Sequence, residues 1–306
     1  MEFNIKILGS NSATPVYNRH PSAQLLNINQ NLMLLDCGEG AQMQLINYKI
    51  RYQRINHIFI THLHGDHYFG LIGLLSTMHL HGRKNDIELY GPAGLDEIIT
   101  LQLKYSETFL AYKINFHSVD TENITQILDA KHFVVETIPL SHRIKCCGYF
   151  FKEKPKKRRL IKEVLPENLS LLTIAALKDG KDILDDDGRV LIKNEDVTLP
   201  PKINRTFAYC TDTAYLEAII PQIANADLLY HESTFLSDLK ARATETYHST
   251  CAEAATIAKK ANVKKLIIGH FSSRYKDLSP LLEEARTIFP ETSLAIEGEV
   301  FEIPEE

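Results

Sequence analysis

The amino-acid sequence predicts a four-layer α/β fold in which two β-sheets pack face to face and helices cover both outer faces. Short strands alternate with helices over the first 150 residues, and the same alternation returns after residue 205. Between these halves, residues 152–205 break the pattern. Because sheets and amphipathic helices must each bury an apolar face, we expect an αββα sandwich with an inserted, protruding arm.

The first half is expected to contain a hairpin and a series of alternating strands and helices. Residues Phe3–Leu8 alternate apolar and polar side chains, as a half-buried strand does. A turn at Asn29–Gln30 joins two further predicted strands, Gln24–Ile28 and Asn31–Asp36. The remaining predicted elements are helix Ala41–Tyr48, strand His57–Thr61, helix Leu71–His79, and strand Ile87–Tyr90 before the turn at Gly91–Pro92.

The second half repeats this logic. Its predicted strands are Thr206–Cys210, Asp227–Tyr230, Lys265–Gly269 and Ser293–Ile296. Its predicted helices are Cys251–Ala261, which Ser249–Thr250 would cap, and Leu281–Ile288.

Length and composition favour a cytoplasmic protein that forms one large domain over residues 1–306. The chain carries 34 basic and 39 acidic side chains, and no stretch approaches the roughly 18 apolar residues of a membrane span. Its first residues, MEFNIKILGS, lack the basic and apolar regions of a secretion signal. The five cysteines are scattered without a C-x-x-C spacing, so reduced thiols are expected.

The segment 152–205 differs from the rest of the chain in charge. It opens with KEKPKKRR and holds 13 basic and 10 acidic residues, a local charge of +3 that leaves -8 elsewhere. We interpret it as an excursion from the core and not as a separate domain. Its composition alone fits an ordinary solvated insertion equally well.

The strongest chemical signal is the heptapeptide THLHGDH at residues 61–67, directly after a predicted strand. Side chains two residues apart in an extended chain point the same way, so His62 and His64 can face one metal ion. A tight turn at Gly65 would direct Asp66 and His67 towards a neighbouring point. Imidazole and carboxylate are ligands that suit zinc and tolerate manganese or iron. The heptapeptide therefore predicts two adjacent metal sites.

Three further candidate ligands lie at the ends of predicted strands. His142 follows one strand in PLSH, Asp212 follows another in YCTDT, and His270 follows a third in IIGH. Each is a weak signal by itself, because a histidine after a strand is usually a loop residue. Together they occupy matching positions on successive strands, which is how sites on α/β folds are assembled.

These motifs resemble the metallo-β-lactamase superfamily and, within it, the ribonuclease Z family, endonucleases that mature the 3′ ends of transfer RNA precursors. The resemblance spans most of the chain. The motifs that carry it are LLDCGEGAQMQL at 34–45, FITHLHGDHYFGLIGLL at 59–75, YGPAG at 90–94, PLSHRI at 139–144, YCTDT at 209–213, HESTF at 231–235, HSTCAEAATIAKKA at 248–261 and IIGHFSSRY at 267–275.

The resemblance implies two zinc ions per subunit and a role for each candidate ligand. His62, His64 and His142 would bind the first ion, and Asp212 would bridge both. Asp66, His67 and His270 would bind the second ion. Two metals of this kind suit phosphoryl transfer, because they can activate a water and hold both oxygens of an in-line displacement.

The resemblance also implies the residues that move protons. Asp66 would accept the proton of the attacking water, or act as a ligand only. His248 would protonate the departing ribose oxygen with Glu232 as its partner, so that the transfer RNA keeps a 3′-hydroxyl and the trailer a 5′-phosphate. The alternative for His248 is a helix-terminal residue beside the Ser249 cap.

Other residues near these motifs receive weaker assignments. Arg274 in FSSRY is a candidate for gripping a substrate phosphate, and a structural salt bridge is the equal alternative. Asp36, Gly38 and Glu39 are expected to support metal-bound imidazoles. We interpret three further histidines as bystanders: His79, His81 and His231.

The resemblance further implies a homodimer that binds precursor transfer RNA, with residues 152–205 as an RNA-binding arm. The basic side chains that would grip the RNA backbone are Lys152, Lys154, Lys156, Lys157, Arg158 and Arg159. The arm of this family usually carries a Gly-Pro element, which is missing from ENLSLLTIAALKDGKDI.

Two alternatives to this interpretation are a hydrolase of small phosphodiesters or other esters, and a metal-free binding module. A hydrolase of small esters would need no long basic excursion. The binding module is disfavoured because all seven candidate ligands are present.

Overall fold

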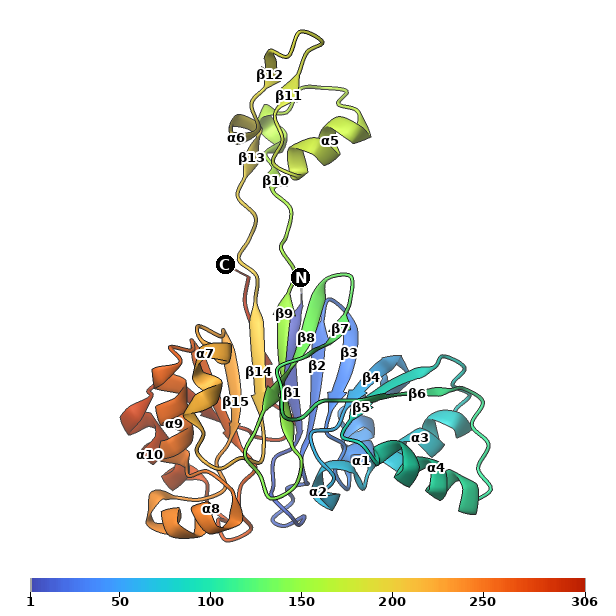
Figure 1. Cartoon of the computed structure of the whole chain (residues 1–306), viewed down its shortest axis with the longest axis vertical. Helices are drawn as coiled ribbons and strands as arrows, with labels where there is room; N and C mark the ends of the chain where they lie inside the picture. The colour runs from blue at the N-terminus through green and yellow to red at the C-terminus, as the bar shows by residue number, and fades with distance from the viewer. Residues whose placement is uncertain (1, 306) are drawn as a thin grey trace.

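The computed structural model describes residues 2–305, and two seven-stranded sheets packed face to face form its centre (Figure 1). The strands of the first sheet, in order, are β18 (Val300–Glu302), β1 (Phe3–Gly9), β2 (Ala23–Ile28), β3 (Asn31–Leu35), β4 (Ile55–Phe59), β5 (Ile87–Gly91) and β6 (Ile114–Ser118). Those of the second are β17 (Thr292–Leu294), β16 (Lys265–Gly269), β15 (Leu228–Glu232), β14 (Thr206–Cys210), β9 (Cys147–Glu153), β8 (Phe133–Pro139) and β7 (Gln126–Asp129).

Each sheet is parallel on one side and antiparallel on the other. Strands β3 to β6 run parallel in the first sheet, and β14 to β17 run parallel in the second. The carboxyl ends of parallel strands meet at one edge of a sheet. The loops after β4, β14 and β16 therefore emerge at the same end of the sandwich.

Helices cover the outer faces, as the αββα prediction requires (Figure 1). Helices α1 (Ala41–Asn47), α3 (Leu71–Leu80) and α4 (Leu95–Tyr105) share one apolar cluster with the first sheet. Helices α9 (Cys251–Lys260) and α10 (Ser279–Ile288) share the larger cluster that also fills the space between the sheets. The predicted fold class is confirmed.

Aromatic side chains join the two sheets. Phe59 of the first sheet lies 5.2 Å from Tyr149 and 5.6 Å from Phe151 of the second, measured between ring centroids. All three rings are fully buried. Their contact surface keeps the two sheets in register with one another, and with them the loops at the sandwich edge.

Some predicted boundaries are wrong. The segment Ser293–Ile296 is not the last strand, because β17 ends at Leu294 and β18 follows, paired with β1. Helix α4 is missed by the sequence prediction, although Leu95, Ile99 and Leu103 follow the spacing of one helix face. Strand β15 runs two residues further than expected, to Glu232. Also absent from the prediction are β6, β7, the central strand β9 and helix α8 (Lys240–Thr246).

The start of α9 follows the predicted cap. The Thr250 side chain accepts a hydrogen bond from the amide of Glu253, and the Glu253 carboxylate accepts one from the amide of Thr250. This capping box satisfies two amides at the helix start. It also fixes the direction of the preceding residues, including His248.

Residues 154–205 leave the second sheet between β9 and β14 and project far from the sandwich (Figure 1). The arm contains helices α5 (Leu171–Lys178) and α6 (Asn194–Val197) and two short hairpin-like pairs. These pairs join β10 (Arg159–Leu160) to β13 (Thr198–Leu199) and β11 (Ile183–Leu184) to β12 (Val190–Ile192). The expected protruding arm is present.

A charged cluster holds the base of the arm. The buried carboxylate of Glu153 accepts hydrogen bonds from Arg205 Nε at 3.0 Å and Nη2 at 2.8 Å. Lys156 lies 2.8 Å from Glu153 and 3.0 Å from Glu305, and Lys202 lies 2.7 Å from Glu305. Both legs of the arm are thus tied to the C-terminal segment.

All five cysteine thiols are free and buried. Burial raises the pKa of Cys147 to about 12, and it also raises the pKa of Cys37, Cys146, Cys210 and Cys251. Separately, no helix within residues 2–305 is long and apolar enough to cross a lipid bilayer.

Candidate active site

The heptapeptide places four candidate ligands at the edge of the first sheet. Strand β4 ends at Phe59, and the following extended residues carry His62 and His64. The short helix α2 (Gly65–Tyr68) then turns the chain, so that Asp66 and His67 lie beside them. A Cβ atom at Gly65 would lie 2.2 Å from the ring of Phe69, so this turn leaves little room for a side chain.

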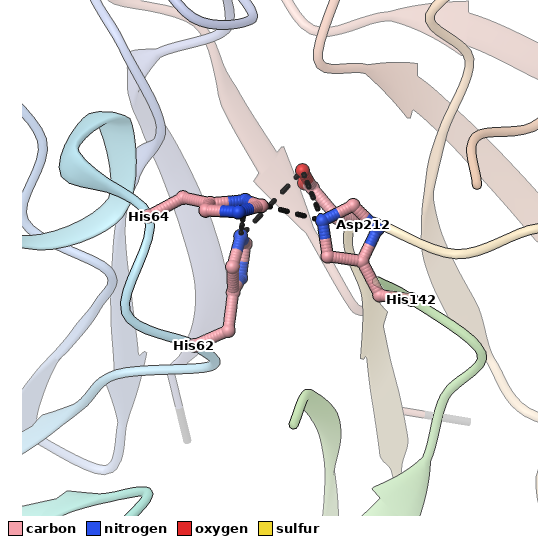
Figure 2. A group of neighbouring side chains, drawn as sticks. All are labelled: His62, His64, His142 and Asp212. Carbon is pink, nitrogen blue, oxygen red and sulfur yellow. Dashed lines mark hydrogen bonds and ion pairs between the residues drawn. The ribbon is translucent and has the colours of Figure 1, made fainter. Parts of the chain in front are cut away.

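Four of the candidate ligands form one group (Figure 2). The Nε2 atoms of His62 and His142 each lie 3.1 Å from Nδ1 of His64. Asp212 Oδ2 lies 3.6 Å from His62 Nε2 and 3.8 Å from His142 Nε2. All four ligand atoms lie within 4.8 Å of one another. Three imidazole nitrogens and one carboxylate oxygen that converge in this way suit a tetrahedral zinc ion.

A second group lies beside the first and consists of Asp66, His67 and His270. Asp66 Oδ2 lies 3.6 Å from His67 Nε2 and 3.5 Å from His270 Nε2. The other oxygen of Asp212, Oδ1, lies 3.2 and 3.1 Å from the same two nitrogens. Asp212 therefore stands between the groups, with one oxygen towards each.

Two buried nitrogens show that the second group fits a cation. His67 Nε2 and His270 Nε2 are buried and form no hydrogen bond, although Asp212 Oδ1 is close to both. A buried nitrogen without a hydrogen bond is costly unless another partner satisfies it. A metal ion bound between these atoms would be that partner.

Hydrogen bonds on the far side of the imidazoles fix their orientation. His67 Nδ1 donates to Asp36 at 2.9 Å, and the fully buried Asp36 also accepts from the Tyr209 hydroxyl at 2.9 Å. His270 Nδ1 lies 3.0 Å from Thr234 Oγ1, and His142 Nδ1 lies 3.1 Å from the carbonyl of Tyr247. Each ring thereby directs its Nε2 towards the metal position, as supporting contacts do in zinc sites.

His248, which lies partly exposed at the cavity, forms an ion pair with the buried Glu232 next to both groups. His248 Nδ1 donates to Glu232 Oε1 at 2.8 Å and lies 4.0 Å from Asp212 Oδ2. Glu232 is fully buried and also accepts hydrogen bonds from the amide of Thr213 and the hydroxyl of Thr234. Burial favours neutral His248, but the negative charge of Glu232 outweighs this and raises the pKa of His248 to about 9. His248 therefore carries a proton at neutral pH.

A cavity of about 450 Å³ opens over the two groups. Asp66 faces it, and Asp66 Oδ2 accepts a hydrogen bond from the amide of Ala13 at 2.8 Å. Burial opposes the ionisation of Asp66, but the positive charge of the nearby His67 ring outweighs this and holds the pKa of Asp66 well below the usual range. The residues that line the cavity are Ser12, Ala13, Thr14, Pro15, Pro21, Glu39, His64, Gly65, Asp66, Phe69, Arg143, Asp212, His248 and His270.

The other candidates lie at varied distances from the cavity. Arg274 is exposed and is not among the residues that line the cavity; its guanidinium lies 5.7 Å from the ring centroid of Phe235 and donates to Ser272 Oγ at 3.3 Å. Its predicted salt-bridge alternative does not occur within residues 2–305. Of the three histidines expected to be bystanders, His79 accepts from the amide of Ala111, His81 contacts Tyr52, and His231 is buried in β15.

The basic side chains at the start of the arm make contacts within the protein. Lys156 is held by two carboxylates at the base, and Lys157 lies 2.9 Å from Asp179. Arg158 donates to Thr198 Oγ1 at 2.7 Å, and Arg159 donates to the carbonyl of Pro200 at 3.3 Å. Lys152 and Lys154 form ion pairs with Glu136 and Asp129.

Comparison with known proteins decides the family. The chain is 53% identical to ribonuclease Z of Cytophaga hutchinsonii, over 98% of this chain and 96% of the relative. It is 45% identical to ribonuclease Z of Bacteroides thetaiotaomicron, over 97% and 94%. The chain belongs to the ribonuclease Z family.

A solved structure and one family model agree with a metallo-β-lactamase fold. The crystal structure of the short form of human tRNase Z superposes with a TM-score of 0.72 at 29% identity, covering 98% of this chain and 99% of that one. Residues 196–271 match the model of the beta-lactamase superfamily domain. Residues 3–157 match the model of the anti-Pycsar protein Apyc1, which ends before Asp212, Glu232, His248 and His270.

Sequence reasoning missed Arg143. Arg143 directly follows His142 in PLSHRI, lines the cavity, and places Nη2 3.3 Å from His64 Nε2. Its position next to the candidate ligand His142 is the one feature of the sequence that could have indicated a role at the site. Its contact with His64, 79 positions away in the chain, is visible only in the structure.

Proposed function

We propose that this chain is a metal-dependent endoribonuclease that cleaves transfer RNA precursors at the 3′ side. The transfer RNA would keep a 3′-hydroxyl and the trailer a 5′-phosphate. The observation that carries the proposal is the pair of ligand groups that share Asp212, with the protonated His248 beside them. The substrate is supported by the ribonuclease Z relatives, which match over nearly the full chain.

The ligand groups would hold two zinc ions per subunit, the first with His62, His64 and His142 and the second with Asp66, His67 and His270. Asp212 would contribute one oxygen to each. Zinc ions bound there supply positive charge for the phosphate and lower the pKa of a bound water. Because imidazole and carboxylate ligands also suit manganese and iron, Mn²⁺ or Fe²⁺ are possible substitutes.

Asp66 would receive the proton of the attacking water. Its carboxylate is ionised, since its pKa is lowered, and its side chain lines the cavity. The amide of Ala13 donates a hydrogen bond to Oδ2 and so fixes the direction of the carboxylate. A general base needs this combination of charge, reach and fixed direction.

His248 would deliver a proton to the departing ribose oxygen. Its Nδ1 is engaged with Glu232, so Nε2 is the nitrogen free to serve the substrate. Glu232 keeps the ring protonated and limits its rotation. The same division of labour between an imidazole and a buried carboxylate occurs in other hydrolases.

Replacing His248→Ala is expected to lower kcat about 10²- to 10³-fold, because a general acid contributes roughly this much. In the unaltered protein, kcat should fall as pH rises through about 9, where His248 loses its proton. Bound cations would move this alkaline limb of the pH–rate profile to lower pH. Measuring kcat as a function of pH checks the prediction. Glu232→Gln should shift the same limb to lower pH, since it removes the charge that raises the pKa of His248. An unchanged limb in both variants would contradict the assignment.

The arm would bind transfer RNA away from the cut. The basic side chains Lys156, Lys157, Arg158 and Arg159 remain candidates for contact with the RNA backbone, and the side chain of Lys157 is 64% exposed. Because Lys156 is held in ion pairs at the base, its main contribution is expected to be the direction of the arm.

Deleting the arm tests this role and separates the two candidate substrates. Joining β9 to β14 in place of residues 154–205 should raise KM for precursor transfer RNA at least about tenfold. Hydrolysis of bis(4-nitrophenyl) phosphate should stay within about twofold, because that small ester reaches the cavity without the arm. Steady-state kinetics on both substrates checks this. Equal losses on both would remove the case for an RNA-binding arm and favour a hydrolase of small phosphodiesters.

We also propose a cytoplasmic homodimer. Met43 and Ile46 lie one turn apart on α1 and are 61% and 50% exposed, an apolar surface that a second copy would cover. Sedimentation equilibrium measures the mass: a value of one chain at micromolar concentration would contradict the dimer.

The decisive experiment for the function is a cleavage assay on a precursor with a 3′ trailer, with both product ends mapped. Release of the trailer by a single cut at the end of the transfer RNA body supports the proposal. Intact precursor after incubation with metal-loaded protein rejects it.

A further inference from the structure

Arg143 is the one lysine or arginine among the described residues that line the cavity. It lies on the loop between β8 and β9 and is exposed to solvent. The same cavity is lined by three carboxylates, Glu39, Asp66 and Asp212. Asp66 and Asp212 belong to the ligand groups, so the other charged side chains of the cavity wall are Glu39, Arg143 and the protonated His248. Arg143 is therefore the guanidinium that can attract an RNA phosphate lying outside the ligand groups.

The contact between Arg143 and His64 points to an anion. His64 directs Nδ1 towards His62 and His142, and its Nε2 towards Arg143 Nη2 at 3.3 Å. If Nδ1 binds a metal ion, the ring hydrogen must be on Nε2, which is then a donor. Arginine has five donors and no acceptor. Two groups of donors then face the same space, and an oxygen that accepts from both would satisfy them.

We propose that Arg143, together with the Nε2–H of His64, binds a phosphate of the RNA next to the scissile one. The scissile phosphate belongs at the Nδ1 side of His64, where the ligand groups converge. Arg143 lies at the opposite side of the same ring, so it reaches a neighbouring linkage. A guanidinium binds phosphate oxygens in bidentate fashion, which positions the strand as well as attracting it. This inference rests on the proposed function and names a substrate contact within it.

The first test compares Arg143→Gln with a matched control, Lys145→Gln. Lys145 lies two residues further along the same loop, is 73% exposed, and does not line the cavity. Arg143→Gln should raise KM for precursor transfer RNA about tenfold, as expected for the loss of a hydrogen bond to a charged group. Lys145→Gln should change KM less than twofold, and Arg143→Lys should recover part of the loss.

The second test measures binding without cleavage. In the His248→Ala background, Arg143→Gln should weaken the Kd of a labelled precursor about tenfold and reduce the slope of log K against log salt by about 1, as one lost phosphate contact does. Two further precursors each carry a neutral methylphosphonate at one of the two linkages that flank the cut. For the linkage that Arg143 binds, the modified precursor should bind the unaltered protein and the Arg143→Gln variant with the same Kd, because the contact is already lost. This non-additivity of the two changes identifies the phosphate.

The outcomes separate this inference from the proposed function. If Arg143→Gln loses metal, measured by elemental analysis, or loses bis(4-nitrophenyl) phosphate hydrolysis to the same extent as RNA cleavage, Arg143 supports His64 and the phosphate contact is rejected. Unchanged KM and salt slope, or no coupling at either flanking linkage, also reject it. Failure of the unaltered protein to cleave any precursor would reject the proposed function instead.

Discussion

Replacing Asp66→Ala is expected to lower kcat/KM for precursor transfer RNA by about 10⁴-fold or more. The substitution removes a ligand of the second group and the carboxylate proposed to accept the proton of the attacking water. General base catalysis alone contributes about 10²- to 10⁴-fold. Single-turnover cleavage assays with excess enzyme measure the loss.

The matched control is Glu39→Ala. Glu39 lines the same cavity, and the expectation that it supports a metal-bound imidazole is wrong, because no hydrogen bond or ion pair within residues 2–305 joins it to the ligand groups. Its loss should change kcat/KM only a few fold. Asp66→Asn separates the two roles, because an amide oxygen can still bind metal but accepts no proton. Full activity in Asp66→Ala would exclude Asp66 as the base, and inactive Asp66→Asn with normal metal content would exclude the ligand-only alternative.

Removing the metal with a chelator is expected to reduce cleavage to background, and adding zinc or manganese back should restore it. The chelated protein should also unfold at a temperature several degrees lower. An ion present at about 100 times its Kd stabilises the folded state by ~2.7 kcal/mol. In a chain of this size, 1 kcal/mol corresponds to roughly 2–4 °C in Tm. Cleavage assays measure the loss and recovery of activity, elemental analysis measures the metal content, and thermal unfolding measures the change in Tm.

Asp212→Ala is the control for this experiment. Asp212 gives one oxygen to each ligand group, so its removal should weaken both sites and make the Tm insensitive to the chelator. Cleavage by protein shown to be free of transition metal would contradict the proposed chemistry.

The parts of the fold that sequence patterns predicted are those set by neighbouring residues. The hairpin Gln24–Ile28 and Asn31–Asp36 follows from alternation around a local turn, and the structure forms it as β2 and β3. The start of α9 follows from the Thr250 cap. The missed helix α4 carries an apolar stripe, because Leu95, Ile99 and Leu103 lie one turn apart and pack in the cluster of the first sheet. The sequence therefore held a local signal for this helix that the prediction did not use.

The candidate site also contains residues whose roles the sequence predicted and residues whose roles only the structure reveals. The residues of THLHGDH are close in the chain, and the structure brings them together as expected with His142, Asp212 and His270. The roles that needed coordinates depend on distant partners. Lys156 pairs with Glu305, 149 residues away, so its presence in a basic run did not reveal its role at the base of the arm.

Because all five sulfhydryl groups are buried, their rate of chemical modification measures how often the folded protein opens. With their pKa values raised, they present almost no reactive thiolate while the sandwich is closed. An alkylating reagent can therefore modify the protein only during excursions that part the sheets or lift α9. Cys146 lies 3.6 Å from the carbonyl of Asp212, so its labelling rate would register how tightly this end of the molecule is held shut.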